Sequence, residues 1–358
     1  MRLRYFTLLV FFVSSATGAF AQIGGTSTYN FLELPVSARA VALGGTFISV
    51  RDGDLSLAAA NPSFLDSTVN NHAIIGYVPF FAGINYDYFS IAHTINGFGF
   101  LGRSGTFDAG VKYINYGTFT QADYAGNITG QFTAAEYMYN IGYGQPIKDS
   151  TINVGANLKG IYSHEATYTS SGIGLDLSGS YISPNKRFFL GMVVQNIGTQ
   201  LKDYTTGDPE PLPFDVQMGF AAKLAHAPFR FGVTAVHLQK WDLTYLDPTD
   251  TQTVNQLTGQ AVPTNNVGNF ADKVMRHLIP NLEVVLSKNF MLRFAYNYEM
   301  RKELELSGRQ GLVGFSGGFG IRIYKFHLSY ALSSYYLGAA TSTFSMGLSL
   351  DDFYTRKT

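Results

Sequence analysis

The sequence predicts an all-β fold, an antiparallel transmembrane β-barrel of about fourteen strands with an N-terminal plug in its lumen. Three observations predict it. Charged residues make up only 14% of the chain, against roughly 25% in soluble globular proteins. Segments of about ten residues alternate apolar with polar or small residues, and the connections between them alternate in length. Tyr (23) and Phe (29) are abundant and suit membrane interfaces.

The first 21 residues predict a signal peptide. Two arginines in Met1 to Arg4 precede an apolar run, and small residues end at Ala19-Phe20-Ala21. Beyond this segment no apolar run approaches the roughly 18 to 20 residues of a spanning helix. Because backbone groups in lipid must pair internally, only a closed barrel can then cross a membrane. We therefore expect an outer-membrane protein whose lipid contacts are made by strands.

Residues 22–68 do not alternate like spanning strands, and we expect them to form a plug inside the lumen. The segment holds a run of small residues, and Asn61-Pro62 marks a turn. A periplasmic tail or an extra strand is the alternative. We interpret Asp52-Gly53-Asp54 as a solvated turn, because it supplies too few oxygens for a calcium ion. The residues expected to define the plug are Arg39, Gly44, Gly45, Asn61 and Pro62.

Alternation within the segments predicts which side chains meet lipid. Tyr137, Tyr139 and Ile141 share one face of a strand, and Asn140 lies on the other. In the next segment Asn157 lies on the polar face. Because side chains alternate along a strand, we expect the aromatic face toward lipid and the asparagines toward the lumen.

Fourteen such segments give the even number that bacterial barrels require. Together they predict a barrel over residues 69–352, followed by a periplasmic tail at 353–358. The predicted strands are 71–79, 84–95, 106–117, 135–145, 151–164, 169–182, 186–197, 213–224, 228–239, 277–287, 289–300, 312–324, 325–335 and 342–351.

The connections after the first hairpin alternate between short turns and longer loops. This pattern predicts periplasmic turns, extracellular loops and both termini in the periplasm. Asn96 to Gly105 is long for a periplasmic turn. The predicted long loops are Thr118 to Ala134, Gly198 to Leu212, Gln239 to Arg276 and Arg301 to Gly311.

A soluble β-sandwich is the alternative fold, since its strands also carry one apolar face. A sandwich would bury that face and place charged residues outside. Here the second face is largely Gly, Ser and Asn, and charge is scarce along the whole chain. The barrel accounts for both features.

The sequence offers no catalytic or metal-binding pattern, so we expect no enzyme activity and no cofactor. The seven histidines are scattered without ligand spacing. Ser183 to Lys186 matches a Ser-x-x-Lys pattern, but it falls in a turn and lacks the partner motifs. Equal numbers of basic and acidic residues, 25 each, provide no field to attract nucleic acid.

The longest predicted loop, Gln239 to Arg276, mixes aromatic and polar residues as binding surfaces do. We expect it to contact a protein partner, with help from Leu201 to Pro213. A disordered polar loop is the alternative. The expected partner-binding residues are Trp241, Tyr245, Leu246, Phe270 and Tyr204.

The segment from Ser37 to Leu65 resembles the plug of the FadL-like barrels associated with type IX secretion. More specific stretches resemble the PorQ-like members of this PorV/FadL-like family. They are Gly24 to Leu32, Tyr113 to Phe119, Gly126 to Phe132, Asn157 to Ser163 and Gln195 to Leu201. The resemblance covers nearly the whole mature chain.

This resemblance implies a fourteen-stranded barrel of the Bacteroidota outer membrane that holds a partner at the cell surface. PorQ-like proteins belong to the complex that processes and attaches type IX cargo. The implied direct partner is PorZ-like, with PorU and PorV in the same complex.

Two other functions fit a barrel of this kind. One is a FadL-like channel or transporter for hydrophobic solutes, and the other is a general porin. A plug fixed in the lumen favours anchoring, whereas a mobile plug or an opening in the wall favours transport. A porin would need a wide pore with opposed charges, and the predicted lumen faces are mostly small or neutral.

Overall fold

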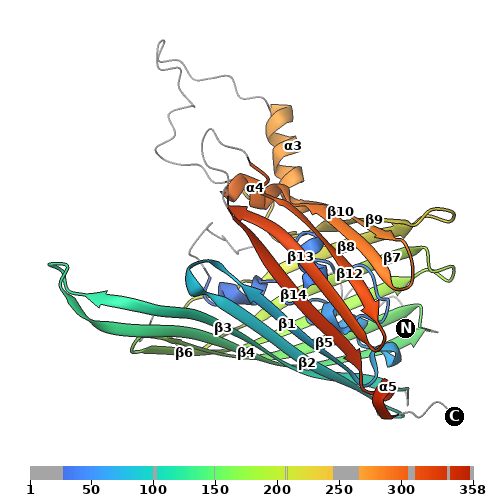
Figure 1. Ribbon diagram of the computed structural model, residues 1–358, viewed down its shortest axis with the longest axis horizontal. Helices are drawn as coiled ribbons and strands as arrows, with labels where there is room; N and C mark the ends of the chain where they lie inside the picture. The colour runs from blue at the N-terminus through green and yellow to red at the C-terminus, as the bar shows by residue number, and fades with distance from the viewer. Residues whose placement is uncertain are drawn as a thin grey trace, which may run out of the picture.

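The fold is a closed antiparallel β-barrel (Figure 1). The computed structural model describes residues 27–99, 103–148, 150–205, 207, 209–244, 266–304, 311–336 and 339–354. Within them each strand pairs with its neighbours along the chain, and β1 closes the barrel against β14. The strands are β1 His72–Pro79, β2 Asn85–Ile95, β3 Gly105–Ala122, β4 Ile128–Lys148, β5 Ile152–Glu165, β6 Tyr168–Ile182, β7 Phe188–Lys202, β8 Asp215–Lys223, β9 Phe229–Ala235, β10 Leu278–Val285, β11 Phe290–Tyr296, β12 Phe315–Ile323, β13 Phe326–Tyr336 and β14 Ala339–Ser349.

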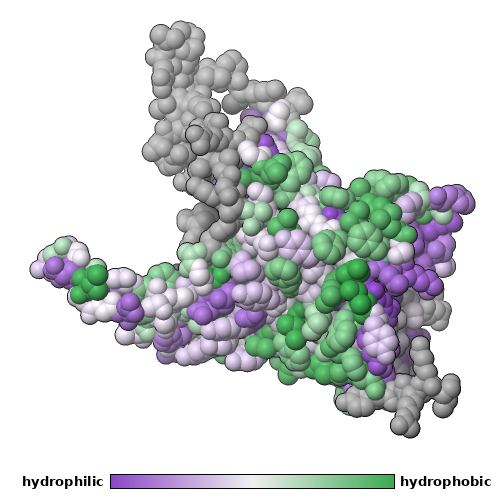
Figure 2. Space-filling view, in the orientation of Figure 1, coloured by the Kyte–Doolittle hydropathy of each residue, from purple (hydrophilic) through white to green (hydrophobic). Residues whose placement is uncertain are grey.

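The outer wall of the barrel is apolar, as the alternation predicts. Tyr139 and Ile141 are 56% and 61% exposed, whereas Asn140 and Asn157 are buried on the lumen side. Tyr137 stacks on Tyr139, with ring centroids 6.4 Å apart. In Figure 2 hydrophobic patches cover the strands in the right half of the molecule, and hydrophilic residues gather at the turns on the right and toward the long hairpin on the left. Such a surface is stable only against lipid, so the strands span a membrane.

Three strands run well beyond their predicted ends: β3, β4 and β7, of which β7 continues to Lys202. Thr118 to Thr120 pair with Gln131 to Thr133, and Phe119 stacks on Phe132 with centroids 5.2 Å apart. These β-branched and aromatic residues favour strand pairing. The predicted loop from Thr118 to Ala134 is therefore mostly a long hairpin, which projects past the other strands in Figure 1.

Strand β11 ends earlier than predicted because a helix cap competes with the strand. The Asn297 side chain accepts a hydrogen bond from the Met300 backbone N–H at 3.0 Å, which favours helix α4 over a continued strand. The helices on the barrel ends are α3 Asn266–His277, α4 Tyr298–Leu304 and α5 Asp351–Tyr354. No helix among the described residues is long and apolar enough to cross a membrane.

The two barrel ends differ. We call the end with α3, α4 and the long hairpin the loop end, and the end with α5 the turn end (Figure 1). Helix α5 occupies part of the stretch 353–358 that the sequence predicts as a tail. The predicted signal peptide lies outside the described residues.

The segment 27–71, called the plug below, lies inside the barrel and runs from one end to the other. At the loop end the Thr28 N–H donates to the Pro211 carbonyl at 3.0 Å, and at the turn end the Leu350 N–H donates to the Asn71 carbonyl at 2.7 Å. The plug contains one α-helix and four short 3-10 helices. They are η1 Asn30–Glu33, α2 Ala38–Ala42, η2 Leu55–Leu57, η3 Pro62–Phe64 and η4 Ser67–Val69; η5 Phe81–Gly83 joins β1 to β2.

Glycines on the lumen face let the plug backbone approach the wall. A Cβ at Gly191 would lie 1.8 Å from the Ile48 carbonyl oxygen, and one at Gly155 would lie 2.4 Å from that of Pro62. Any side chain there would push the plug away. The glycine-rich lumen face thus shapes a close fit between the plug and the barrel.

Candidate functional site

A buried ion network joins the plug to one wall of the barrel. Arg39 in α2 binds Asp52 through two hydrogen bonds of 2.8 Å and Asp54 at 3.0 Å. The same guanidinium donates to Glu283 of β10 at 3.1 Å. Bidentate contacts of this kind are the strong and directional form of arginine–carboxylate pairing.

The barrel supplies the other half of the network. Arg230 of β9 donates to Glu283 at 2.6 Å and to Asp52 at 3.1 Å. Arg293 of β11 donates to Glu283 at 3.2 Å. We call these six residues, Arg39, Asp52, Asp54, Arg230, Glu283 and Arg293, the plug lock.

Charge is balanced in the plug lock and is complementary across it. The plug contributes one arginine and two aspartates, a net charge of −1, and the barrel contributes two arginines and one glutamate, a net charge of +1. Arg39, Glu283 and Arg293 are the most buried members, and removing one of these three would leave an uncompensated buried charge, at a cost of about 3–5 kcal/mol. The plug is therefore held in one position.

The stretch Asp52-Gly53-Asp54, expected as a solvated turn, is exposed at Asp52 and half-buried at Gly53 and Asp54, but it also has ionic partners that the expectation did not include. Both carboxylates pair with arginines, Asp52 with Arg39 and Arg230 and Asp54 with Arg39. Charges at lumen-facing positions of β9, β10 and β11 also correct the expectation of a mostly small or neutral lumen face.

The remaining predicted plug residues shape its backbone. Asn61 is fully buried; its side chain donates to the Ile48 carbonyl at 2.8 Å and caps η3, which Pro62 begins. Gly44 and Gly45 end α2 with φ of +97°, a conformation that glycine adopts without strain. The Gly45 N–H donates to the Ala40 carbonyl at 2.9 Å.

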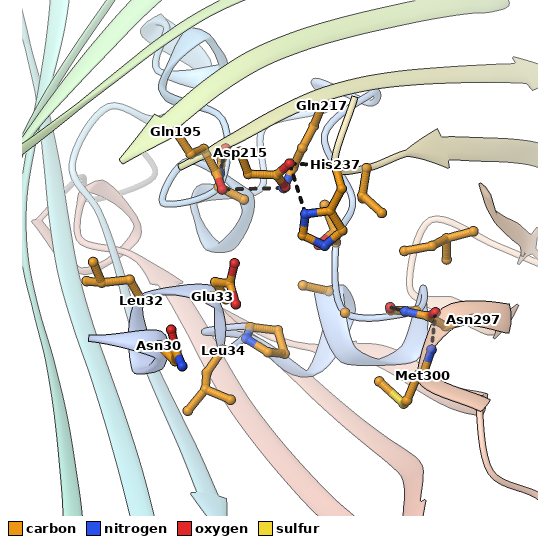
Figure 3. Close-up of a pocket in the computed structure, with 18 of the residues that line it drawn as sticks. Asn30, Leu32, Glu33, Leu34, Gln195, Asp215, Gln217, His237, Asn297 and Met300 are labelled. Carbon is orange, nitrogen blue, oxygen red and sulfur yellow. Dashed lines mark hydrogen bonds and ion pairs between the residues drawn. The ribbon is translucent and has the colours of Figure 1, made fainter. Parts of the chain in front are cut away.

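A cavity of about 540 Å³ lies between the plug and the loops at the loop end (Figure 3). Its walls come from η1 and α2 of the plug, from the lumen faces of the strands, and from α4 and the loop after β9. In Figure 3 the Glu33 carboxylate points into this space, with Asp215 and His237 across from it. We call it the lumenal cavity.

Acidic groups and a histidine dominate its electrostatics. His237 lies 3.2 Å from Asp215 and 3.6 Å from Glu299. Burial alone would lower the pKa of His237, but the hydrogen bond and charge of Asp215, helped by Glu299, raise it to about 9. Burial raises the pKa of Glu299 to about 7 against the opposing charge of His237. Burial also raises the pKa of Glu33.

An aromatic pair stands on the loop end. Trp241 and Phe270 are 57% and 59% exposed, with ring centroids 5.9 Å apart, and His277 also stacks on Trp241. We call Trp241 and Phe270 the aromatic patch. Tyr245 and Leu246, also expected to bind a partner, lie outside the described residues.

Tyr204 has a different environment from that expected of a surface anchor. Its ring packs against Tyr29 of the plug at 6.3 Å, and its hydroxyl bonds to Ser163. It is partly buried between the plug and the wall. Its contacts in this structure are with the plug, through Tyr29, and with strand β5, through Ser163.

Sequence reasoning missed the barrel half of the plug lock and the cavity residues His237 and Glu299. The available signal was a charge inside an otherwise apolar or neutral strand pattern, at Arg230, Glu283 and Arg293. A charge on the lumen face of a filled barrel needs a partner, and the plug is the nearest source.

Comparison with known proteins shows likeness of fold only. No family model matches the chain, and no curated protein matches its sequence. A mutant of the TodX monoaromatic hydrocarbon channel is similar, with 13% identity over 88% of this chain and 97% of that one, at a TM-score of 0.47. A Pseudomonas aeruginosa FadL homologue has 9% identity over 87% and 97%, also at 0.47.

The closed barrel and its apolar outer wall assign the chain to an outer membrane, where antiparallel barrels are the spanning fold.

Proposed function

We propose that the protein is a closed outer-membrane barrel that anchors a soluble protein at its loop end, without enzymatic activity of its own. The observation that carries this proposal is the plug lock. A plug tied by buried ion pairs to β9, β10 and β11 fills the lumen and stiffens the wall beneath the loops. A rigid barrel with a filled lumen is better suited to anchoring a partner than to transporting a solute.

The aromatic patch supplies the contact surface. Exposed Trp residues are typical binding hot spots, because they bury a large area with few rotatable bonds. Trp241 already contacts the rings of Phe270 and His277, so less conformational entropy would be lost on binding than for an unsupported side chain. Phe270 belongs to α3, which lies above the strands in Figure 1, and so it is not part of the strand wall that meets lipid.

Sequence resemblance supports a more specific form of this proposal. The PorQ-like stretches favour a role in type IX attachment, with a PorZ-like partner on the loop end and PorU and PorV in the same complex. The comparisons with solved structures bring no support to this finer assignment and lie nearer to the channel candidate below.

The test is a double substitution, Trp241→Ser with Phe270→Ser. We expect the barrel to insert normally and the partner to be lost from outer-membrane pull-downs analysed by mass spectrometry. Tyr124→Ser is the matched control, since Tyr124 is another exposed aromatic at the loop end, on the β3–β4 turn. If the double variant still retains the same partner, the aromatic patch is not the surface that binds it.

The second candidate is a FadL-like channel for small solutes, and the lumenal cavity favours it. Its volume, about 540 Å³, is typical of small-molecule sites. Transport would require the plug to move, so it predicts solute flux into liposomes that rises when the plug lock is broken. Flux through the unmodified protein would favour this candidate over the anchor.

A further inference from the structure

Exposed charge is divided unevenly between the two ends of the barrel. The chain as a whole is neutral, with 25 basic and 25 acidic residues. At the turn end six exposed basic side chains lie on the turns or on the last residues of strands, and two exposed aspartates, Asp351 and Asp352, lie in α5. We call the six basic residues the basic ring. They are Arg103, Lys186, Arg187, Lys223, Lys288 and Arg322.

The loop end has the opposite balance. Lys202 is the one exposed basic residue among those described there, whereas five acidic residues are exposed. The exposed acidic residues are Asp123, Glu165, Glu210, Asp242 and Glu303. The exposed charge of a neutral chain is thus separated, with the positive charge at the turn end and the negative charge at the loop end.

The basic ring has no counter-charge in the described part of the chain. None of its six side chains forms an ion pair with another described residue, whereas Lys159, Lys273 and Arg276 each do. The five turns beside the ring, residues 96–104, 183–187, 224–228, 286–289 and 324–325, contain no aspartate or glutamate.

Some members of the ring are also close to one another. The Lys223 backbone N–H donates to the Arg187 carbonyl at 2.8 Å, and Lys186 precedes Arg187 in the same turn. Like charges at neighbouring positions repel each other. An anionic partner from outside the chain would therefore stabilise this end of the barrel.

The basic ring adjoins the apolar outer wall. An exposed apolar residue follows Arg187, Lys223 and Arg322 directly in the sequence. Tyr324 is 81% exposed, and the Lys325 ammonium lies 5.1 Å from the centre of its ring. Basic and aromatic residues at the edge of an apolar wall are typical of the level of lipid headgroups. The apolar residues are Phe188, Leu224 and Ile323.

The basic ring is distributed around the barrel. Its members lie at the β2–β3, β6–β7, β8–β9, β10–β11 and β12–β13 connections, which are five of the six hairpin connections at this end. Figure 2 shows hydrophilic residues at the turns on the right. A folded protein would contact one part of such a ring, whereas lipid headgroups surround the whole barrel. The distribution therefore favours lipid as the partner.

We propose that the basic ring binds the phosphate groups of anionic glycerophospholipids in the leaflet at the turn end. Lys and Arg side chains are long enough to reach these phosphates from the strand ends. The exposed carboxylates of the loop end repel the same headgroups, so the charge separation also favours one orientation of the barrel in a membrane whose leaflets differ in charge. This binding is independent of the anchoring function proposed above.

The experiment is electron spin resonance of the full-length barrel in phosphatidylcholine vesicles. The vesicles contain spin-labelled phosphatidylglycerol or, in a matched sample, spin-labelled phosphatidylcholine, and the motionally restricted fraction of the label reports contact with the protein. We expect an at least about threefold preference for phosphatidylglycerol at low ionic strength. This preference should disappear in about 1 M salt, where the screening length is about 3 Å. Equal restriction of both lipids at low ionic strength would overturn the proposal.

Substitutions locate the binding groups. Lys186→Gln, Arg187→Gln and Lys223→Gln together should reduce the preference by about half, because they remove three of the six charges. Two controls should keep it: the charge-preserving set Lys186→Arg, Arg187→Lys and Lys223→Arg, and Lys202→Gln at the loop end. The heat-dependent gel shift of the barrel reports that each variant is folded. An unchanged preference in the folded glutamine variant would refute the basic ring as the site.

Two other anionic partners give different results. Displacement of the spin-labelled phosphatidylglycerol by lipopolysaccharide at lower concentration than by unlabelled phosphatidylglycerol would assign the ring to lipid A and overturn the choice of glycerophospholipid. An acidic protein that the unmodified barrel retains in pull-downs and the glutamine variant loses, without any lipid preference in vesicles, would assign the ring to a protein and overturn the lipid partner.

Discussion

Replacing Arg39 by Met tests whether the plug lock holds the plug. The substitution keeps much of the side-chain volume and removes the one cation that the plug supplies to Asp52, Asp54 and Glu283. The network then holds three carboxylates against two arginines. The cost of breaking a buried pair, about 3–5 kcal/mol, falls entirely on the docked state of the plug.

That cost translates into a large change in plug opening. Each 1.4 kcal/mol is about tenfold in an equilibrium, so the open fraction should rise about a hundred- to a few-thousand-fold. The chain has no cysteine, so one introduced thiol reports on one place. Ser49→Cys is suitable, because Ser49 is a buried plug residue whose hydroxyl has no hydrogen-bond partner among the described residues.

The assay is the rate of Ser49→Cys labelling by a water-soluble maleimide in the folded barrel, with and without Arg39→Met. Arg322→Met is the control, since Arg322 is an exposed arginine at the turn end of β12. We expect faster labelling only with Arg39→Met. Equal rates in all three backgrounds would mean that packing alone holds the plug, and the reasoning from buried charge would be wrong.

Three further predictions follow from the same structure. Because the pKa of His237 is raised from 6.5 to about 9 and that of Glu299 from 4.5 to about 7, both groups stabilise the loop end at low pH. This stabilisation is lost as pH rises through these ranges, so amide exchange in α4 should speed up at least tenfold beyond its intrinsic pH dependence by pH 9. The variant His237→Gln should lack the part of this increase that occurs at the higher pH values. An exchange profile that is the same in the variant and the unmodified protein would contradict the role of His237. Gly191→Val should displace the plug and destabilise the barrel by about 1–3 kcal/mol in thermal melts. Gly160→Val is the control and should have little effect, because a Cβ at Gly160 would have no neighbouring atom within 4 Å. An equal loss of stability in both variants would argue against a close fit between plug and wall. Tyr139→Cys should react with a lipid-soluble thiol probe and Asn140→Cys should not, since these side chains lie on opposite faces; the reverse result would show the register to be wrong.

Local pattern was enough to predict the barrel because its signals are local. Side-chain alternation fixes which face of a strand meets lipid, and loop lengths fix which strands are neighbours. Strand ends were less predictable. The sequence from Thr118 to Ala134 contains Gly and Asn that favour a loop, yet pairing of Phe119 with Phe132 extends the hairpin.

The site could not be predicted in the same way because its contacts are distant in sequence. Arg39 and Glu283 are 244 positions apart, and neither has a neighbour that reveals the other. Asp52-Gly53-Asp54 has the local composition of a solvated turn, and only the fold brings Arg39 and Arg230 against it. His237 and Glu299 are brought together by the fold around the cavity rather than by any motif.

The path of the plug through the lumen limits the order in which this protein can assemble. The plug joins directly to β1, the first strand, whose partner β14 is the last to emerge during synthesis or export. Its ionic partners lie on β9, β10 and β11, which also come late. The N-terminal end of the plug must reach the loop end, beside Pro211, while the β1–β14 seam is still open. Once β1 has paired with β14, a plug that is still outside can no longer enter between these two strands. Closure of this seam is therefore the final step of folding. Contacts of such long sequence separation form slowly, and the arginines and carboxylates of the plug lock would remain hydrated until then.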